Sequence, residues 1–101
     1  IELLGRAPLL YELGALTSDP GAQSQPFHYD HLADGRLNVI SCFIALQDID
    51  TSMGPTELQL HTHRPVGQPD PLWGSVEGRA AAGRQALLAA GDMLIYDARL
   101  R

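Results

Sequence analysis

Lysine is absent from this sequence, and all seven of its basic residues are arginines. The arginines are scattered along the chain, and with twelve acidic residues the formal net charge is −5. Proteins that bind nucleic acids depend on clustered cations, which displace counterions from the phosphate backbone. We therefore expect no nucleic acid among the partners of this chain.

Cysteine and long apolar runs are also scarce. Cys42 is the only cysteine, which excludes an intramolecular disulfide and a four-cysteine zinc site. It lies in the apolar run 39–44, where a small buried thiol is the usual arrangement. No stretch approaches the ~20 apolar residues of a membrane span, so we expect no membrane-spanning segment.

The first residues do not resemble a secretory signal. Ile1 is not an initiator methionine, and Glu2 stands where a signal peptide carries positive charge. We therefore expect a cytoplasmic protein, and a chain that is a piece of a longer one.

Ten glycines and seven prolines divide the 101 residues into short apolar segments. At this length we expect one domain, residues 1–101. Short strands separated by turns are typical of an all-β sandwich or barrel, here with little helix. The run 37–46 is continuously apolar, which predicts a strand buried on both faces. The other expected strands are 25–30, 56–60 and 93–97, with turns at 17–21, 34–36 and 91–92, a loop at 50–55 and a long loop at 64–79; residues 9–16 and 80–90 fit either strand or helix.

The triplet His28-Tyr29-Asp30 is the first sign of chemistry. On an extended segment, residues two apart project from the same face, so the imidazole and the carboxylate can converge on one ion. Two histidines and one carboxylate are the ligands of many non-haem Fe(II) oxygenases. A half-exposed strand with two polar side chains is the plainer interpretation of the same triplet.

Three blocks of the sequence, in order, resemble segments of the phytanoyl-CoA dioxygenase family. Residues 25–30, Q-P-F-H-Y-D, resemble the family's Q-P-x-H-x-D segment. Residues 44–63 are similar to its stretch from A-L-x-D through G-P to [ST]-H. Residues 91–100 are similar to the Gly-Asp turn and apolar strand that lead to the second iron-binding histidine. The resemblance covers nearly the whole chain.

The resemblance implies a double-stranded β-helix, a jelly roll that encloses Fe(II), here incomplete. His28 and Asp30 would be metal ligands, and 2-oxoglutarate would be the cosubstrate. The second histidine ligand would fall just beyond Arg101, and the cation that binds the far carboxylate of 2-oxoglutarate further on. The chain is therefore expected to be a C-terminally truncated fragment that is inactive by itself.

The resemblance also implies a reaction for the parent protein. It would be a dioxygenase that uses O₂ to hydroxylate an unactivated C–H bond of a small-molecule or acyl substrate, while 2-oxoglutarate is decarboxylated to succinate. Asp30 favours hydroxylation over halogenation, because the related halogenases have a small residue in its place.

Three further residues are candidates for binding the cofactor. Phe43 matches a family position that lines the cosubstrate pocket, although core packing would also explain an aromatic residue there. Thr56 could direct its hydroxyl at a bound carboxylate, or serve only as a good strand residue. Gln25 would contact the substrate or hold the His28 segment through its amide.

The sequence departs from the family at Leu60-His61, which replace the usual Pro-Gly. A changed surface turn is one explanation. A rival is a cupin-like metal enzyme that uses His28 with His61 and His63. A second rival is a non-catalytic jelly-roll module that has lost its metal site.

Overall fold

The structure is a computed structural model that describes residues 4–30, 39–63 and 83–100. Within those ranges the regular elements are four short strands and one 3₁₀ turn, and no α-helix is present. No helix in the described residues is long and apolar enough to cross a membrane. The elements are β1 (Ile40–Ile44), η1 (Thr51–Met53), β2 (Glu57–Gln59), β3 (Gly83–Gln85) and β4 (Met93–Asp97).

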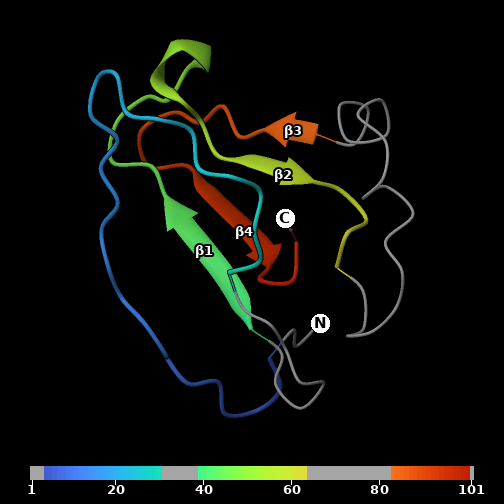
Figure 1. Cartoon of the computed structure of the whole chain (residues 1–101). Coiled ribbons are helices and arrows are strands. Elements are labelled where there is room, and N and C mark those ends of the chain that lie inside the picture. Colours follow the sequence, from blue (N-terminus) through green and yellow to red (C-terminus); the bar gives the residue numbers. More distant parts are fainter. Residues whose placement is uncertain (1–3, 31–38, 64–82, 101) are drawn as a thin grey trace.

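The strands form two antiparallel pairs (Figure 1). In the first, β1 pairs with β4, so that Ile40 lies opposite Asp97 and Ile44 opposite Met93. In the second, β2 pairs with β3, from Glu57 opposite Gln85 to Gln59 opposite Gly83. The expectation of a mostly β chain is therefore confirmed. The described residues show two two-stranded sheets and not a complete jelly roll.

A tight turn leads into β4 as the Gly-Asp pair predicts. Gly91 has φ 91°, in the left-handed region that glycine enters without steric cost. The Asp92 carboxylate accepts a hydrogen bond from the Ala89 amide at 2.9 Å, and the Asp48 carboxylate accepts one from the Ala90 amide at 2.8 Å. The turn at 91–92 and the strand at 93–97 are both confirmed.

The expected strand at 37–46 is present as β1 over Ile40–Ile44, but none of its residues is fully buried. Cys42 is exposed, and Ile44 and Ile95 of the paired strand are 55% and 54% exposed. The prediction of a strand buried on both faces, and of a buried thiol, was wrong. Successive side chains point to opposite faces, and the described residues cover only the face that carries Ser41 and Tyr96.

The buried core in the described residues is small. It contains the apolar residues Ala45, Tyr96 and Ala98 and the polar residues Gln59 and Thr62. The Thr62 hydroxyl donates to the carbonyl of Gln59 at 2.8 Å, which satisfies it despite its burial. The Gln59 side-chain nitrogen is buried without a hydrogen-bond partner.

The N-terminal segment differs most from expectation. Residues 9–16 are exposed and form neither strand nor helix, and residues 25–30 pair with no strand. The expected turn at 17–21 is confirmed, since the Ala22 amide donates to the Asp19 carbonyl at 3.0 Å. Figure 1 shows residues 4–20 as an arc away from the sheets, after which the chain crosses toward β4.

Two expected features lie outside the described residues: the turn at 34–36 and the loop at 64–79. Of the ambiguous segment 80–90, residues 83–85 form β3. The expected strand at 56–60 is confirmed as β2, and the loop at 50–55 contains the turn η1.

Candidate metal centre

His28 is held by its own segment. Its Nδ1 lies 2.9 Å from the carbonyl oxygen of Pro26. A carbonyl can only accept a hydrogen bond, so Nδ1 must carry the proton that is shared with it. In the neutral ring this leaves the lone pair on Nε2, the nitrogen turned toward Asp30. Histidines that bind metals are commonly held in the same way, by a bond from the other ring nitrogen to a carbonyl.

Asp30 presents its two carboxylate oxygens to different partners. Oδ1 lies 3.5 Å from Nε2 of His28. Oδ2 accepts hydrogen bonds from the Tyr96 hydroxyl at 2.5 Å and from the Ser41 hydroxyl at 3.2 Å. Asp30 is therefore anchored through one oxygen, and the other faces the imidazole.

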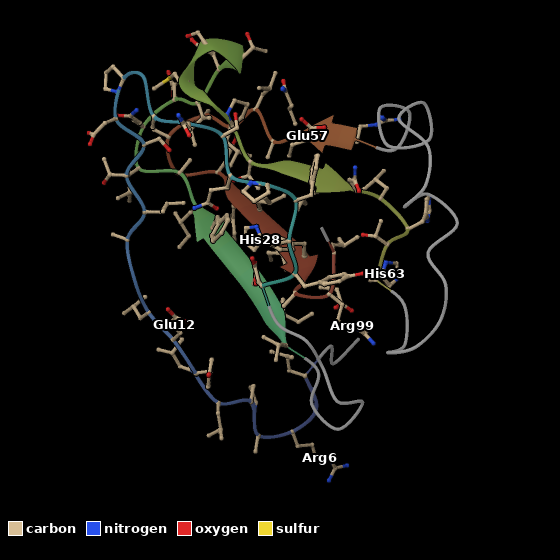
Figure 2. All side chains as sticks on the ribbon, viewed as in Figure 1. Arg6, Glu12, His28, Glu57, His63 and Arg99 are labelled. Carbon is tan, nitrogen blue, oxygen red and sulfur yellow. The ribbon has the colours of Figure 1, made fainter. Side chains whose placement is uncertain are left out.

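The convergence of His28 and Asp30 was predicted, but its cause was not. The prediction placed both side chains on one face of a strand, whereas residues 25–30 belong to no sheet. Instead the hydrogen bonds from Tyr96 and Ser41 bring Asp30 onto the β1–β4 pair, and Pro26 orients His28. Figure 2 shows His28 on the segment that crosses in front of β4.

His28 and Asp30 turn one polar atom each toward the other, 3.5 Å apart. Nε2 of a neutral imidazole and Oδ1 of a carboxylate are both acceptors, so a proton or a metal ion must lie between them for the contact to be favourable. Two ligand atoms about 2.1 Å from one ion, at a right angle, stand about 3 Å apart, so the observed separation of 3.5 Å is about 0.5 Å wider than such a pair requires. The His28 side chain is 56% exposed and that of Asp30 34%, so an ion there is open to solvent or to a cosubstrate.

Tyr96 is the most perturbed titratable group at the site. It is 8% exposed and lies opposite Ser41 in the β1–β4 register. Burial raises the pKa of the Tyr96 phenol far above its usual value of 10.0, and the hydrogen bond to the Asp30 carboxylate and its negative charge raise it further. The Ser41 hydroxyl acts in the opposite direction. Tyr96 therefore remains a neutral donor to Asp30 throughout the physiological range.

The three candidate cofactor residues are placed differently. The ring of Phe43 packs edge-on against the ring of Tyr96, with centroids 5.6 Å apart and planes at 72°. Phe43 thus supports the residue that anchors Asp30, and it is 39% exposed beside it. Gln25 is exposed on the His28 segment, and Thr56 is half-buried before β2. In the described part of the chain, neither Gln25 nor Thr56 forms a hydrogen bond with Asp30. The hydroxyl donors to Asp30 are Tyr96 and Ser41.

The rival histidine pair does not join this site. Within residues 4–30, 39–63 and 83–100, no three His, Cys, Asp or Glu side chains are grouped so that they could hold a metal ion. His28, His61 and His63 all lie in those ranges, so they form no triad. His61 has a positive φ of 66°, which fits a tight turn at the altered 60–61 position.

His63 lies instead near a separate ion pair (Figure 2). Arg99 donates two parallel hydrogen bonds to Asp97, from Nη2 to Oδ2 at 2.5 Å and from Nε to Oδ1 at 2.8 Å. The Arg99 guanidinium holds the pKa of Asp97 below its usual value, and the charge of His63 acts in the same direction. Because its carboxylate is committed to Arg99, Asp97 is not a free metal ligand.

Sequence reasoning did not identify Tyr96 and Ser41 as site residues. Tyr96 was predicted only as part of a strand, and Ser41 only as part of an apolar run. Their sequence neighbours give no signal, because Tyr96 is 66 residues from Asp30. The alternation of each strand could have placed Ser41 and Tyr96 on one shared face only if the pairing of β1 with β4 had been known.

No protein-family model, no curated protein and no solved structure matches this chain.

Proposed function

We propose that this chain is the metal-binding part of a non-haem Fe(II), 2-oxoglutarate-dependent oxygenase similar to the phytanoyl-CoA dioxygenases. The observation that supports this most is the opposition of two acceptor atoms, Nε2 of His28 and Oδ1 of Asp30, at 3.5 Å. Each side chain is also held through its second polar atom. Nδ1 of His28 donates to the Pro26 carbonyl, and Oδ2 of Asp30 accepts from the Tyr96 hydroxyl. Such an arrangement suits a shared cation better than it suits two independent polar side chains.

The donor set fits Fe(II) as far as it extends. One imidazole nitrogen and one carboxylate oxygen are two of the three ligands of the oxygenase site. No third ligand is grouped with them among the described residues. In the proposed site the third is the histidine that the family resemblance puts directly after Arg101. The two antiparallel strand pairs would be parts of a double-stranded β-helix.

In the proposed enzyme, the residues of this chain bind and orient the reactants. His28 and Asp30 hold the ion from one side, and Phe43 provides an apolar wall beside Tyr96. Thr56 and Gln25 are assigned to cosubstrate and substrate contacts. Fe(II) with 2-oxoglutarate would supply O₂ activation, which leads to hydroxylation of a C–H bond and release of succinate and CO₂. The substrate is proposed only as a small molecule or an acyl compound.

Anaerobic titration of the 101-residue chain with Fe(II) and 2-oxoglutarate tests the proposal. Free imidazole is added to supply the third nitrogen ligand. We expect the visible charge-transfer band of a 2-oxo acid chelated to protein-bound Fe(II). His28→Ala and Asp30→Ala should each abolish the band, because each removes one of only two protein ligands.

His61→Ala and His63→Ala are the matched controls, and both should retain the band. A band that is retained in Asp30→Ala but lost in His61→Ala and His63→Ala would favour the cupin-like enzyme instead. A wild-type chain that binds no Fe(II) at any imidazole concentration would favour the non-catalytic module.

A further inference from the structure

Two hydroxyl groups from neighbouring strands converge on the same oxygen atom of Asp30. Ser41 of β1 and Tyr96 of β4 are direct partners in the strand register, so both project from the same face. Both donate to Oδ2, at 3.2 Å and 2.5 Å. Neither donates to Oδ1, the oxygen that faces His28.

We propose that Tyr96 and Ser41 are positioning residues that make Asp30 a one-oxygen metal ligand. The inference rests on the proposed function, because Tyr96 and Ser41 are hydrogen-bonded to Asp30, one of the two proposed metal ligands. The hydroxyls hold Oδ2 away from the ion, and Oδ1 alone is presented to it beside Nε2 of His28.

Binding of the ion through Oδ1 alone matters because the proposed site must also hold a cosubstrate. A carboxylate can bind an ion through one oxygen or chelate it through both. In an octahedral site, chelation would take one of the positions left open for 2-oxoglutarate and O₂. Chelation by Asp30 would require Oδ2 to turn away from two hydroxyl donors. The hydrogen bonds therefore keep that position free.

Tyr96 is the stronger of the two anchors. Its bond to Oδ2 is shorter than that of Ser41, and its ring is buried and supported by the edge of Phe43. Ser41 is half-buried and has the longer bond. Loss of the Tyr96 hydroxyl should therefore have the larger effect.

Titration of the 101-residue chain with Co(II), a spectroscopic substitute for Fe(II), provides the test. Loss of a group that orients a metal ligand typically weakens metal binding by about 10- to 100-fold. We expect a loss in this range for Tyr96→Phe and a smaller loss for Ser41→Ala. We also expect a changed d–d spectrum of the bound Co(II) in Tyr96→Phe, because the released Oδ2 of Asp30 then takes one of the other positions on the ion.

Two control variants remove hydroxyls of the same kind elsewhere. Tyr11→Phe alters a tyrosine that is 82% exposed. Ser52→Ala removes a serine hydroxyl that donates to Asp50 at 2.6 Å, away from the site. Both should bind Co(II) as the wild type does, with the same spectrum.

The outcomes separate this inference from the proposed function. If Asp30→Ala abolishes Co(II) binding but Tyr96→Phe and Ser41→Ala bind as the wild type does, the positioning role is wrong and the metal site stands. Weaker binding by Tyr96→Phe with an unchanged spectrum and a lower urea midpoint would mean that Tyr96 only supports the fold, which also overturns the inference. Co(II) binding that is unaffected by Asp30→Ala would overturn the proposed function and the inference together.

Discussion

At the scale of single residues, the site depends on which atoms of Asp30 and His28 are already occupied. The Pro26 carbonyl occupies Nδ1 of His28, and the Tyr96 and Ser41 hydroxyls occupy Oδ2 of Asp30. What remains is one nitrogen and one oxygen that face each other. The residue types alone would not distinguish these free atoms from the occupied ones.

Tyr96 should make the chain sensitive to alkali. Burial and the bond to Asp30 raise its pKa in the folded state above the unfolded value of 10.0. The corresponding stability is fully present below pH 10 and is lost as pH rises above it, because the unfolded chain releases the proton first. We expect the free energy of unfolding in urea to fall more steeply between about pH 9 and 11 in the wild type than in Tyr96→Phe.

Tyr11→Phe is the control variant, because it removes the hydroxyl of a tyrosine that is 82% exposed. Equal slopes for the wild type and Tyr96→Phe would contradict the burial of the Tyr96 phenol and its bond to Asp30.

Gln59 has a buried side-chain nitrogen without a hydrogen-bond partner, and the side chain is 1% exposed. A buried donor left unsatisfied costs about 1–3 kcal/mol. Gln59→Met removes the donor and keeps the shape, so we expect it to increase the free energy of unfolding by about 1 kcal/mol, measured in urea.

Gln85→Met provides the comparison, since Gln85 is exposed on β3 and the change should have an effect within about 0.5 kcal/mol. A loss of stability in Gln59→Met would mean that the Gln59 amide contributes a favourable interaction.

At the scale of elements, the turn before β4 controls the strand that carries Tyr96. Gly91 has φ 91°, and a Cβ added there would meet no atom within 4 Å. Any cost of Gly91→Ala is therefore a cost of backbone conformation. For a non-glycine residue in the left-handed region this is about 1–2 kcal/mol, and we expect a loss of that size in urea unfolding.

Gly14→Ala is a matched control for the turn. A Cβ added at Gly14 would also meet open space, but the φ of Gly14 does not lie in the left-handed region. The same change should therefore be neutral or slightly stabilising, since alanine restricts the unfolded chain. Equal effects at the two glycines would contradict the conformational explanation.

At the scale of the whole molecule, the described residues leave much apolar surface uncovered. Ile44, Met93 and Ile95 on the outer face of the β1–β4 pair are each more than half exposed. Leu9 and Leu13 on the N-terminal arc are 91% and 87% exposed. Contiguous exposed apolar surface and unpaired strand edges promote association between chains.

We therefore expect the isolated 101-residue chain to self-associate as its concentration rises. Light scattering per unit of protein mass should rise with concentration. Ile95→Thr should reduce this rise, because threonine keeps the strand preference and removes apolar surface. Leu46→Thr, at an 87% exposed position outside the strands, should reduce scattering less. Scattering per unit of protein mass that does not change with concentration would contradict this expectation.

The sequence by itself determined the features that act over a few residues. The Gly-Asp turn at 91–92, the strand at 93–97 and the turn at 17–21 follow from glycine, proline and local side-chain hydrogen bonds. The pairing of His28 with Asp30 as a candidate ligand set was also visible in the residues. The turns and the strand were predicted correctly because their physical causes lie next to one another in the chain, whereas the role of His28 and Asp30 as metal ligands stays a prediction.

Only the tertiary structure decided how Asp30 is anchored and which face of β1 is covered. Ser41 and Tyr96 meet because β1 and β4 pair in one register, although they lie far apart in the sequence. Residues 25–30 were expected to be a strand, yet they cross the sheet unpaired. Local preference cannot specify such contacts, since they depend on which distant segments bury each other's side chains.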